Sequence, residues 1–243
     1  MIDRMSPTER PAGRASGFQR WRELLFLHWE VPAEQLAKLL PTDLTVDTFD
    51  GKAYVGIVPF TMRDVSPRWS PSVPGISNFH ELNVRTYVHY KGTNPGVWFF
   101  SLDAAGSIAV GVARAGWTLP YYRAWMDLEK TGITNEYKSS RLFPGPRPAK
   151  FHAKYDIGDE VGPAKPGTLD HFLVERYILY TQRQSGLYMG RVHHAPYQLR
   201  NVELDTWDES MLRAAGLERP DAEPLATYSI GVDVDVFSLE EVV

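Results

Sequence analysis

The sequence predicts an α+β protein built mainly from antiparallel β-structure. Nineteen glycines and eighteen prolines divide the chain into short segments, a pattern typical of sheet-rich folds with tight turns. Several segments alternate apolar and polar residues with the period of two expected for a half-buried strand. Hydrophobic residues make up 43% and charged residues 23% of the 243 residues. This ordinary globular balance excludes collagen, coiled coil and general disorder as the main state.

Local signals define the elements of the first half. Pro32 stands where a helix would begin, and the leucines that follow share one face of a helix ending before Pro41. Asp50-Gly51 predicts a hairpin between the strands on either side. Small residues over 104–116 predict a tightly packed helix. The expected strands are 21–31, 44–49, 53–60, 81–89 and 97–102.

The second half of the chain also consists of short expected strands separated by turn residues. Pro144-Gly145-Pro146 separates two expected strands, Thr168 can cap a short helix through Leu173, and Ser185-Gly186 joins a strand pair. The expected strands are 133–140, 150–157, 177–182, 187–194 and 227–237. With no repeat or composition break, we expect one domain over 18–243 after a disordered arm over 1–17.

Composition excludes several function classes. The cysteine count is zero, which removes thiol nucleophiles, disulfides and cysteine-ligated metal centres. The formal net charge of -4 provides no basic excess for a nucleic-acid partner. The longest stretch without Asp, Glu, Lys or Arg, from Trp69 to His80, is shorter than the about 20 apolar residues of a membrane span. We expect a cytoplasmic protein without a membrane partner, and the sequence leaves a homo-oligomer open.

The seven histidines do not form a metal-binding motif. His80-Glu81 and His193-His194 are adjacent pairs on expected strands, and strand neighbours face opposite sides. Distant strands could still bring ligands together. Because dinucleotide, P-loop and nucleophile-elbow motifs are also absent from the sequence, we expect no metal and no cofactor.

Glu81, Asn83 and Arg85 are the main polar group of the clearest strand. At a period of two, their side chains rise from one strand face about 7 Å apart. A carboxylate, an amide and a guanidinium in a row can bind a polar ligand or shift one another's pKa. The alternative is a solvated strand face with a weak surface ion pair. Phe79 and Tyr87 on the same face favour a partly enclosed site.

Two further groups of residues are candidates. Tyr121 and Tyr122 follow Pro120 on an extended segment, so one of them could enter a cavity while the other packs outside. Arg176, Tyr180 and one of the histidines at 193–194 could meet in one pocket. The alternatives are ordinary aromatic packing and a structural, hydrogen-bonding histidine.

The eight lysines lie in turns, polar stretches or expected exposed faces. An imine-forming lysine needs an apolar setting that lowers its pKa. Lys150 and Lys154 are the only marginal candidates, so covalent amine catalysis is not expected.

Longer motifs add a family resemblance. The segment Phe79–Val88, together with Phe99–Ala104, Leu119-Pro120-Tyr121 and Arg176-Tyr177, resembles the YqjF-like family of uncharacterised bacterial proteins over residues 18–236. That family looks like a branch of the acetoacetate decarboxylase superfamily. The resemblance implies a closed or cone-shaped antiparallel β-structure with small peripheral helices and an internal ligand cavity.

The comparison with the decarboxylases rests on short motifs. Arg22-Glu23 resembles an Arg-Glu pair of an early strand, and Ala109-Val110-Gly111 has a counterpart that leads into a Pro-Lys-Lys motif. Here that motif is replaced by Pro120-Tyr121-Tyr122, so the Schiff-base lysine and its neighbour are both absent. A phenol cannot form an imine, although Tyr121 can donate a hydrogen bond to a carbonyl or enolate oxygen.

We therefore expect an internal polar cavity for a small keto or carboxylate-bearing ligand. Glu81 is the expected acid or base, and Tyr121 is the expected hydrogen-bond donor. A lyase, hydrolase or isomerase without a Schiff base fits the sequence, and so does a protein that only binds or senses a small molecule. The expected ligand-binding residues are Arg22, Asn83, Arg85, Arg176, Tyr180 and His194.

Overall fold

The structure, a computed structural model, describes residues 2–72, 77–106 and 118–242. Its helices are short: η1 (Ser6–Thr8), α1 (Ala33–Ala37), α3 (Leu169–Val174) and α4 (Met211–Ala214). Its strands are β1 (Gly17–Val31), β2 (Leu44–Val46), β3 (Ala53–Pro67), β4 (Phe79–Tyr90), β5 (Thr93–Ala104), β6 (Tyr121–Thr131), β7 (Thr134–Arg141), β8 (Lys150–Pro163), β9 (Ile178–Arg183), β10 (Gly186–His193), β11 (Gln198–Glu209), β12 (Leu225–Val236) and β13 (Glu240–Glu241).

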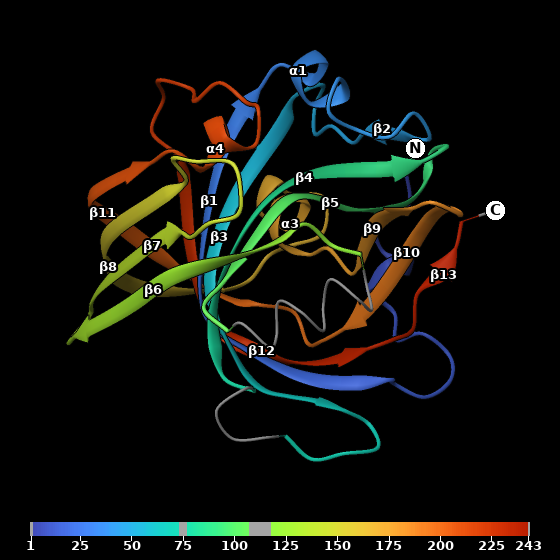
Figure 1. The fold of residues 1–243 in the computed structure, drawn as a ribbon, viewed down its shortest axis with the longest axis horizontal. Coiled ribbons are helices and arrows are strands. Elements are labelled where there is room, and N and C mark those ends of the chain that lie inside the picture. The colour runs from blue at the N-terminus through green and yellow to red at the C-terminus, as the bar shows by residue number, and fades with distance from the viewer. Residues whose placement is uncertain (1, 73–76, 107–117, 243) are drawn as a thin grey trace.

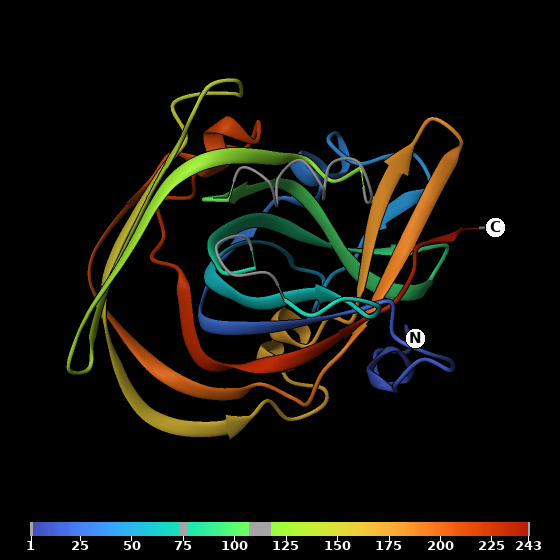
Figure 2. The same ribbon diagram turned by 60° about the horizontal axis from the view of Figure 1, so that its bottom comes forward.

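These thirteen strands form one sheet, and the chain of strand pairings in it is closed. The order β5-β6-β7-β8-β11-β12-β1-β3-β4 closes because β4 also pairs with β5, and β10 makes a second connection to β12. Only β5–β6 and β5–β9 are parallel among the described strand pairs. Figures 1 and 2 show β6, β7, β8 and β11 as a curved wing on one side and the β9–β10 hairpin on the other. The prediction of a mainly antiparallel sheet with small helices is confirmed.

Strand β4 lies between β3 and β5, and both of its faces are buried. Leu82 and Val84 point into an apolar core that also contains Ile57 of β3 and Tyr137 of β7. The odd-numbered residues of β4 point to the opposite side, as the alternation of a strand requires. That side forms the wall of an internal cavity.

Several expected elements need correction. Asp50 and Gly51 do form a turn, but the hairpin ends after one bridge between Phe49 and Lys52. Strand β2 then pairs with β4 instead of β3, because β1 and β4 occupy the two edges of β3. Strands β6 and β11 are not among the expected strands, since their exposed residues interrupt the apolar pattern. The helix expected over 104–116 falls almost entirely outside the described residues.

The N-terminal arm makes defined contacts, although disorder was expected before Phe18. Arg4 forms an ion pair with the buried Asp47, and Arg10 forms another with Asp235 of β12. Pro7 is buried. These contacts tie the arm to two distant parts of the sheet.

Membrane spanning by a helix has no support in the described residues. None of the helices there is both long and apolar enough to cross a bilayer.

Candidate ligand cavity

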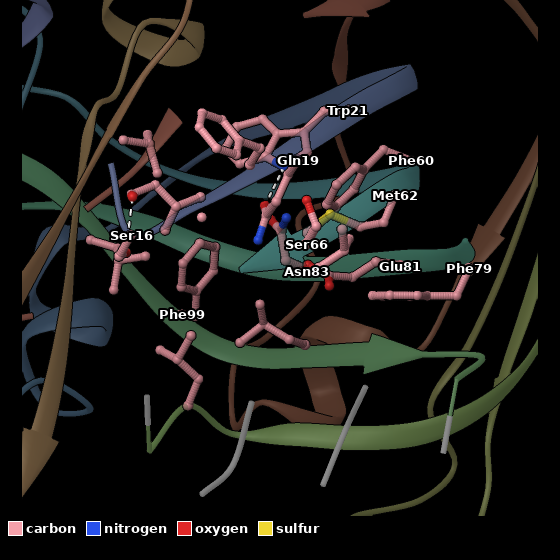
Figure 3. Close-up of a pocket in the computed structure, with 18 of the residues that line it drawn as sticks. Ser16, Gln19, Trp21, Phe60, Met62, Ser66, Phe79, Glu81, Asn83 and Phe99 are labelled. Carbon is pink, nitrogen blue, oxygen red and sulfur yellow. Dashed lines mark hydrogen bonds between the residues drawn. The ribbon is translucent and has the colours of Figure 1, made fainter. Parts of the chain in front are cut away.

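A cavity of about 670 Å³ lies inside the closed sheet. Strands β1, β3, β4 and β5 provide most of its wall, and β9, β10 and β12 contribute to the rest. Figure 3 shows Glu81 and Asn83 of β4 among aromatic and apolar side chains, with the polar side chains of Ser16, Gln19 and Ser66 nearby. The apolar wall includes Trp21, Leu24, Val58, Phe60, Met62, Phe79, Val97, Phe99, Leu102 and Leu119.

The polar row predicted on β4 lines this cavity. Glu81, Asn83 and Arg85 all contribute to the wall and are only 2%, 6% and 8% exposed, respectively. The alternative of a solvated strand face is therefore wrong. The strand is covered on both sides because the sheet curves around and closes over its odd-numbered face.

Glu81 forms a buried hydrogen-bonded pair with Tyr121, the first residue of β6. The Tyr121 hydroxyl donates to Glu81 Oε2 over 2.9 Å. Burial raises the pKa of Glu81 to about 8, and the nearby Asp103 carboxylate adds to the rise, while the tyrosine hydrogen bond opposes it. Burial also raises the pKa of Tyr121 well above its ordinary value. At neutral pH, both groups are proton donors.

Arg85 brings a positive charge to the other end of the row. Its Nη2 donates to the Leu173 carbonyl of α3 over 3.0 Å. Its guanidinium carbon lies 5.7 Å from the Phe26 ring centroid and 5.8 Å from that of Tyr87. No carboxylate lies within ion-pair distance of Arg85 in the part of the chain that the structure describes, so the charge is available to an anionic ligand.

Arg176, just before β9, also lines the cavity. Its Nε donates to the Phe172 carbonyl over 2.7 Å, and its Nη1 donates to Asp47 over 2.9 Å. Asp47 also pairs with Arg4, so one carboxylate serves two guanidinium groups. This leaves the region around Arg85 and Arg176 with an excess of positive charge.

Three polar atoms of the wall are buried without a hydrogen-bond partner among the described residues. They are the Asn83 Oδ1, the Arg85 Nε and the Arg176 Nη2. Buried polar atoms are nearly always satisfied, and each exception needs an explanation.

Arg22 lies outside the cavity, contrary to the sequence prediction. Trp21 and Leu24 of β1 both line the cavity although they are three residues apart. The regular alternation of inward and outward side chains along β1 is interrupted at Glu23, whose φ of 57° lies in the left-handed region. The Arg22 side chain is therefore directed away from the cavity. There it binds Asp233 and the Val232 carbonyl.

Tyr180 is also placed away from the cavity. It is buried in a separate apolar cluster of β9 and β10, and its hydroxyl donates to the Asn94 carbonyl. The expectation that Arg176 and Tyr180 share one pocket is wrong. The preceding residues Ile178 and Leu179 both line the cavity, whereas the Tyr180 side chain is directed into the other cluster.

His194 lies behind the cavity wall. Its ring stacks on Tyr177 with centroids 4.4 Å apart and also contacts Tyr197, and both tyrosines line the cavity. Its Nδ1 donates to the Ala195 carbonyl, and burial lowers its pKa to about 4. His193 and His194 both border a second hollow instead. The structural alternative for His194 matches this placement.

The adjacent tyrosines point in opposite directions, as the extended backbone required. Tyr121 enters the cavity, whereas the Tyr122 ring packs beneath the guanidinium of Arg141 at 4.1 Å. Arg141 is itself paired with Asp103 in a fully buried ion pair. No lysine is present among the described residues of the cavity wall, so the structure offers no amine for an imine there.

The sequence analysis missed most of the apolar wall. Phe60 and Met62 lie at alternating positions of β3; Phe60 ends the predicted strand, and extending that strand past residue 60 would have added Met62. The Asp47–Arg176 pair joins positions 129 residues apart, and no local pattern could have indicated it.

Metal ligands are not grouped in the described residues. No set of three or more His, Cys, Asp or Glu side chains there could hold a metal ion.

Sequence comparison agrees with the fold. The model of DUF2071, described as an uncharacterized conserved protein, matches residues 18–233. The chain belongs to the DUF2071 family. The uncharacterized protein YqjF of Bacillus subtilis (strain 168) is 40% identical to this chain over 216 residues. The matched region covers 89% of this chain and 88% of that protein. The predicted YqjF-like membership is thereby confirmed.

Solved structures place this DUF2071 chain in the acetoacetate decarboxylase-like fold. The enduracididine biosynthesis enzyme MppR complexed with pyruvate superposes with a TM-score of 0.63 at 12% identity, covering 96% of this chain and 92% of that one. The acetoacetate decarboxylase of Legionella pneumophila gives a TM-score of 0.63 at 14% identity, covering 98% and 94%. An acetoacetate decarboxylase-like enzyme from Sphingomonas wittichii RW1 gives 0.63 at 11%, covering 95% and 94%. Likeness at this identity establishes the shared fold.

Proposed function

We propose that the protein binds a small organic acid carrying a carbonyl group in its internal cavity and acts on it by acid catalysis. The observation that carries this proposal is the combination of a neutral Glu81–Tyr121 pair and an Arg85 guanidinium without a carboxylate partner among the described residues, all in one apolar wall. Apolar pockets with a few convergent polar groups and shifted pKa values are the usual form of small-molecule sites.

Each polar group has a part in this proposal. The guanidinium of Arg85 holds the carboxylate, since charge-assisted hydrogen bonds to a planar anion are strong and directional. On binding, the Tyr121 hydroxyl turns its single O–H from Glu81 to the carbonyl oxygen, and protonated Glu81 supplies the proton as that oxygen gains charge. An enol forms when the α-carbon then loses a proton to water. This chemistry needs no lysine.

Binding is tested with 4-phenylbutyrate and its primary amide, titrated by calorimetry. We expect the carboxylate to bind at least about tenfold more tightly than the amide, which corresponds to about 1.4 kcal/mol. Arg85→Met should remove that preference. The matched control is Arg22→Met, because Arg22 lies outside the cavity and pairs with Asp233, and it should keep the preference.

Turnover is tested separately, by NMR of keto acids incubated with the protein in heavy water. Exchange of the α-hydrogens that depends on Glu81 supports acid catalysis. Binding without exchange favours the alternative of a binding or sensing protein. If carboxylate and amide bind equally, the assignment of Arg85 is wrong. The cytoplasmic location and the homo-oligomer remain predictions from the sequence.

A further inference from the structure

The polar groups of the cavity lie at two separate places. Glu81 with Tyr121 marks one place, and Arg85 with Arg176 marks the other. Glu81 and Arg85 are four residues apart on β4, so their Cα atoms are separated by about 13 Å at the rise of a strand. β4 keeps an uninterrupted register with β3 over this stretch. The two polar places therefore cannot serve adjacent groups of a very small molecule.

The arginine end is a single unit. Both guanidinium groups lie within 6 Å of the Tyr87 ring centroid, Arg85 at 5.8 Å and Arg176 at 5.0 Å. Both also donate to consecutive carbonyls of α3, those of Phe172 and Leu173. Each keeps one buried nitrogen without a partner in the described structure. Asp47 is shared between Arg4 and Arg176, so the two guanidinium groups at this end keep an excess of positive charge that suits a carboxylate.

The space between the two ends is mainly apolar. Phe60 and Met62 of β3 lie on one side of the polar row and Phe99 of β5 on the other (Figure 3). Among the labelled side chains near this surface, Asn83, Gln19 and Ser66 are the polar ones. The cavity volume of about 670 Å³ lies within the range of about 300–1,000 Å³ that proteins use for drug-sized ligands, and a three-carbon acid would leave most of it empty.

We propose that the cavity takes an elongated organic acid whose carboxylate lies at Arg85 and Arg176 and whose carbonyl oxygen lies at Glu81 and Tyr121. An apolar chain or ring connects the two groups and packs against the aromatic wall, with Asn83 beside its middle. Acids whose carbonyl is next to the carboxylate are poor ligands, because they reach only one end. This inference rests on the proposed function and specifies its ligand class.

Two isomers test this geometry on the unmodified protein. In 8-oxononanoate the ketone is far from the carboxylate, and in 2-oxononanoate the two groups are adjacent, while size and apolar content are the same. Calorimetric titration should give at least a tenfold tighter Kd for 8-oxononanoate. Tyr121→Phe should weaken 8-oxononanoate severalfold and leave 2-oxononanoate unchanged. Arg85→Met should weaken both isomers.

The outcomes separate the two proposals. Equal affinity, or tighter binding of 2-oxononanoate, overturns the elongated-ligand inference and leaves the carboxylate site in place. Binding of pyruvate without binding of either isomer also overturns the elongated-ligand inference and leaves the carboxylate site in place. If none of these acids binds at millimolar concentration, the proposed function itself fails.

Discussion

The two faces of strand β4 are equally buried but differ in chemistry. Leu82 and Val84 on one face are 0% exposed and pack in the apolar core. Glu81 and Asn83 on the other face are 2% and 6% exposed and border the cavity. One face is filled by neighbouring side chains, and the other leaves room for about 670 Å³ of empty space.

This difference shows that burial alone does not make a core. The filled face contributes stability through close packing and removal of apolar area from water. The cavity face carries a desolvation penalty, which is visible in the raised pKa of Glu81. Polar residues kept in a costly position are a mark of a functional site.

The largest expected effect on stability comes from a substitution on the core-facing side of β4. Leu82→Ala should lower the free energy of unfolding by about 2–5 kcal/mol, because a large-to-small change in a close-packed core leaves a new cavity. Denaturant unfolding measures this. The matched change on the other face is Asn83→Leu, which removes an oxygen without a partner among the described residues. It should stay within about 1 kcal/mol of the wild type. Equal losses at both positions would contradict the comparison.

The pH dependence of stability gives an effect of similar size. Burial raises the pKa of Glu81 from an ordinary 4.5 to about 8 in the folded protein. Between these values, the folded state keeps a proton that the unfolded state has released. The contribution of Glu81 to stability is therefore full below pH 4.5, falls by about 1.4 kcal/mol per pH unit as pH rises, and levels off above pH 8.

Glu81→Gln is the matched variant for this measurement, since glutamine has a similar shape and does not titrate. The difference in unfolding free energy between wild type and variant, followed from pH 4.5 to 9, isolates Glu81 from all other titrating groups. A flat difference across this range would show that the Glu81 side chain is hydrated and not buried as described.

The smallest effect concerns Tyr121. Its hydroxyl donates to Glu81 and thereby holds the pKa of that carboxyl lower than burial alone would. Tyr121→Phe should shift the upper end of the Glu81 titration to higher pH and lower stability by about 1 kcal/mol. Tyr122→Phe is the control, because that ring packs on Arg141 away from the cavity. A shift caused by Tyr122→Phe instead would mean that the two tyrosines have been placed on the wrong sides.

The sequence was informative wherever a local pattern decides the structure. The period of two on β4 placed Glu81, Asn83 and Arg85 on one face, and Pro120 with the following extended backbone separated the directions of Tyr121 and Tyr122. Thr168 caps α3 as predicted, with its hydroxyl accepting from the His171 amide. The predictions failed where a single backbone irregularity reversed a face, as at Glu23 beside Arg22.

By itself, the sequence determined the β-rich class of the fold and the polar row on β4, because residue type and strand alternation depend only on near neighbours. The tertiary structure decided which face of that strand would close around a cavity. It also decided that Glu81 would meet Tyr121, and that Arg176 would join Arg85 through α3. The Glu81–Tyr121 contact spans 40 residues of the chain and the Arg85–Leu173 contact spans 88, so only the tertiary fold could determine them.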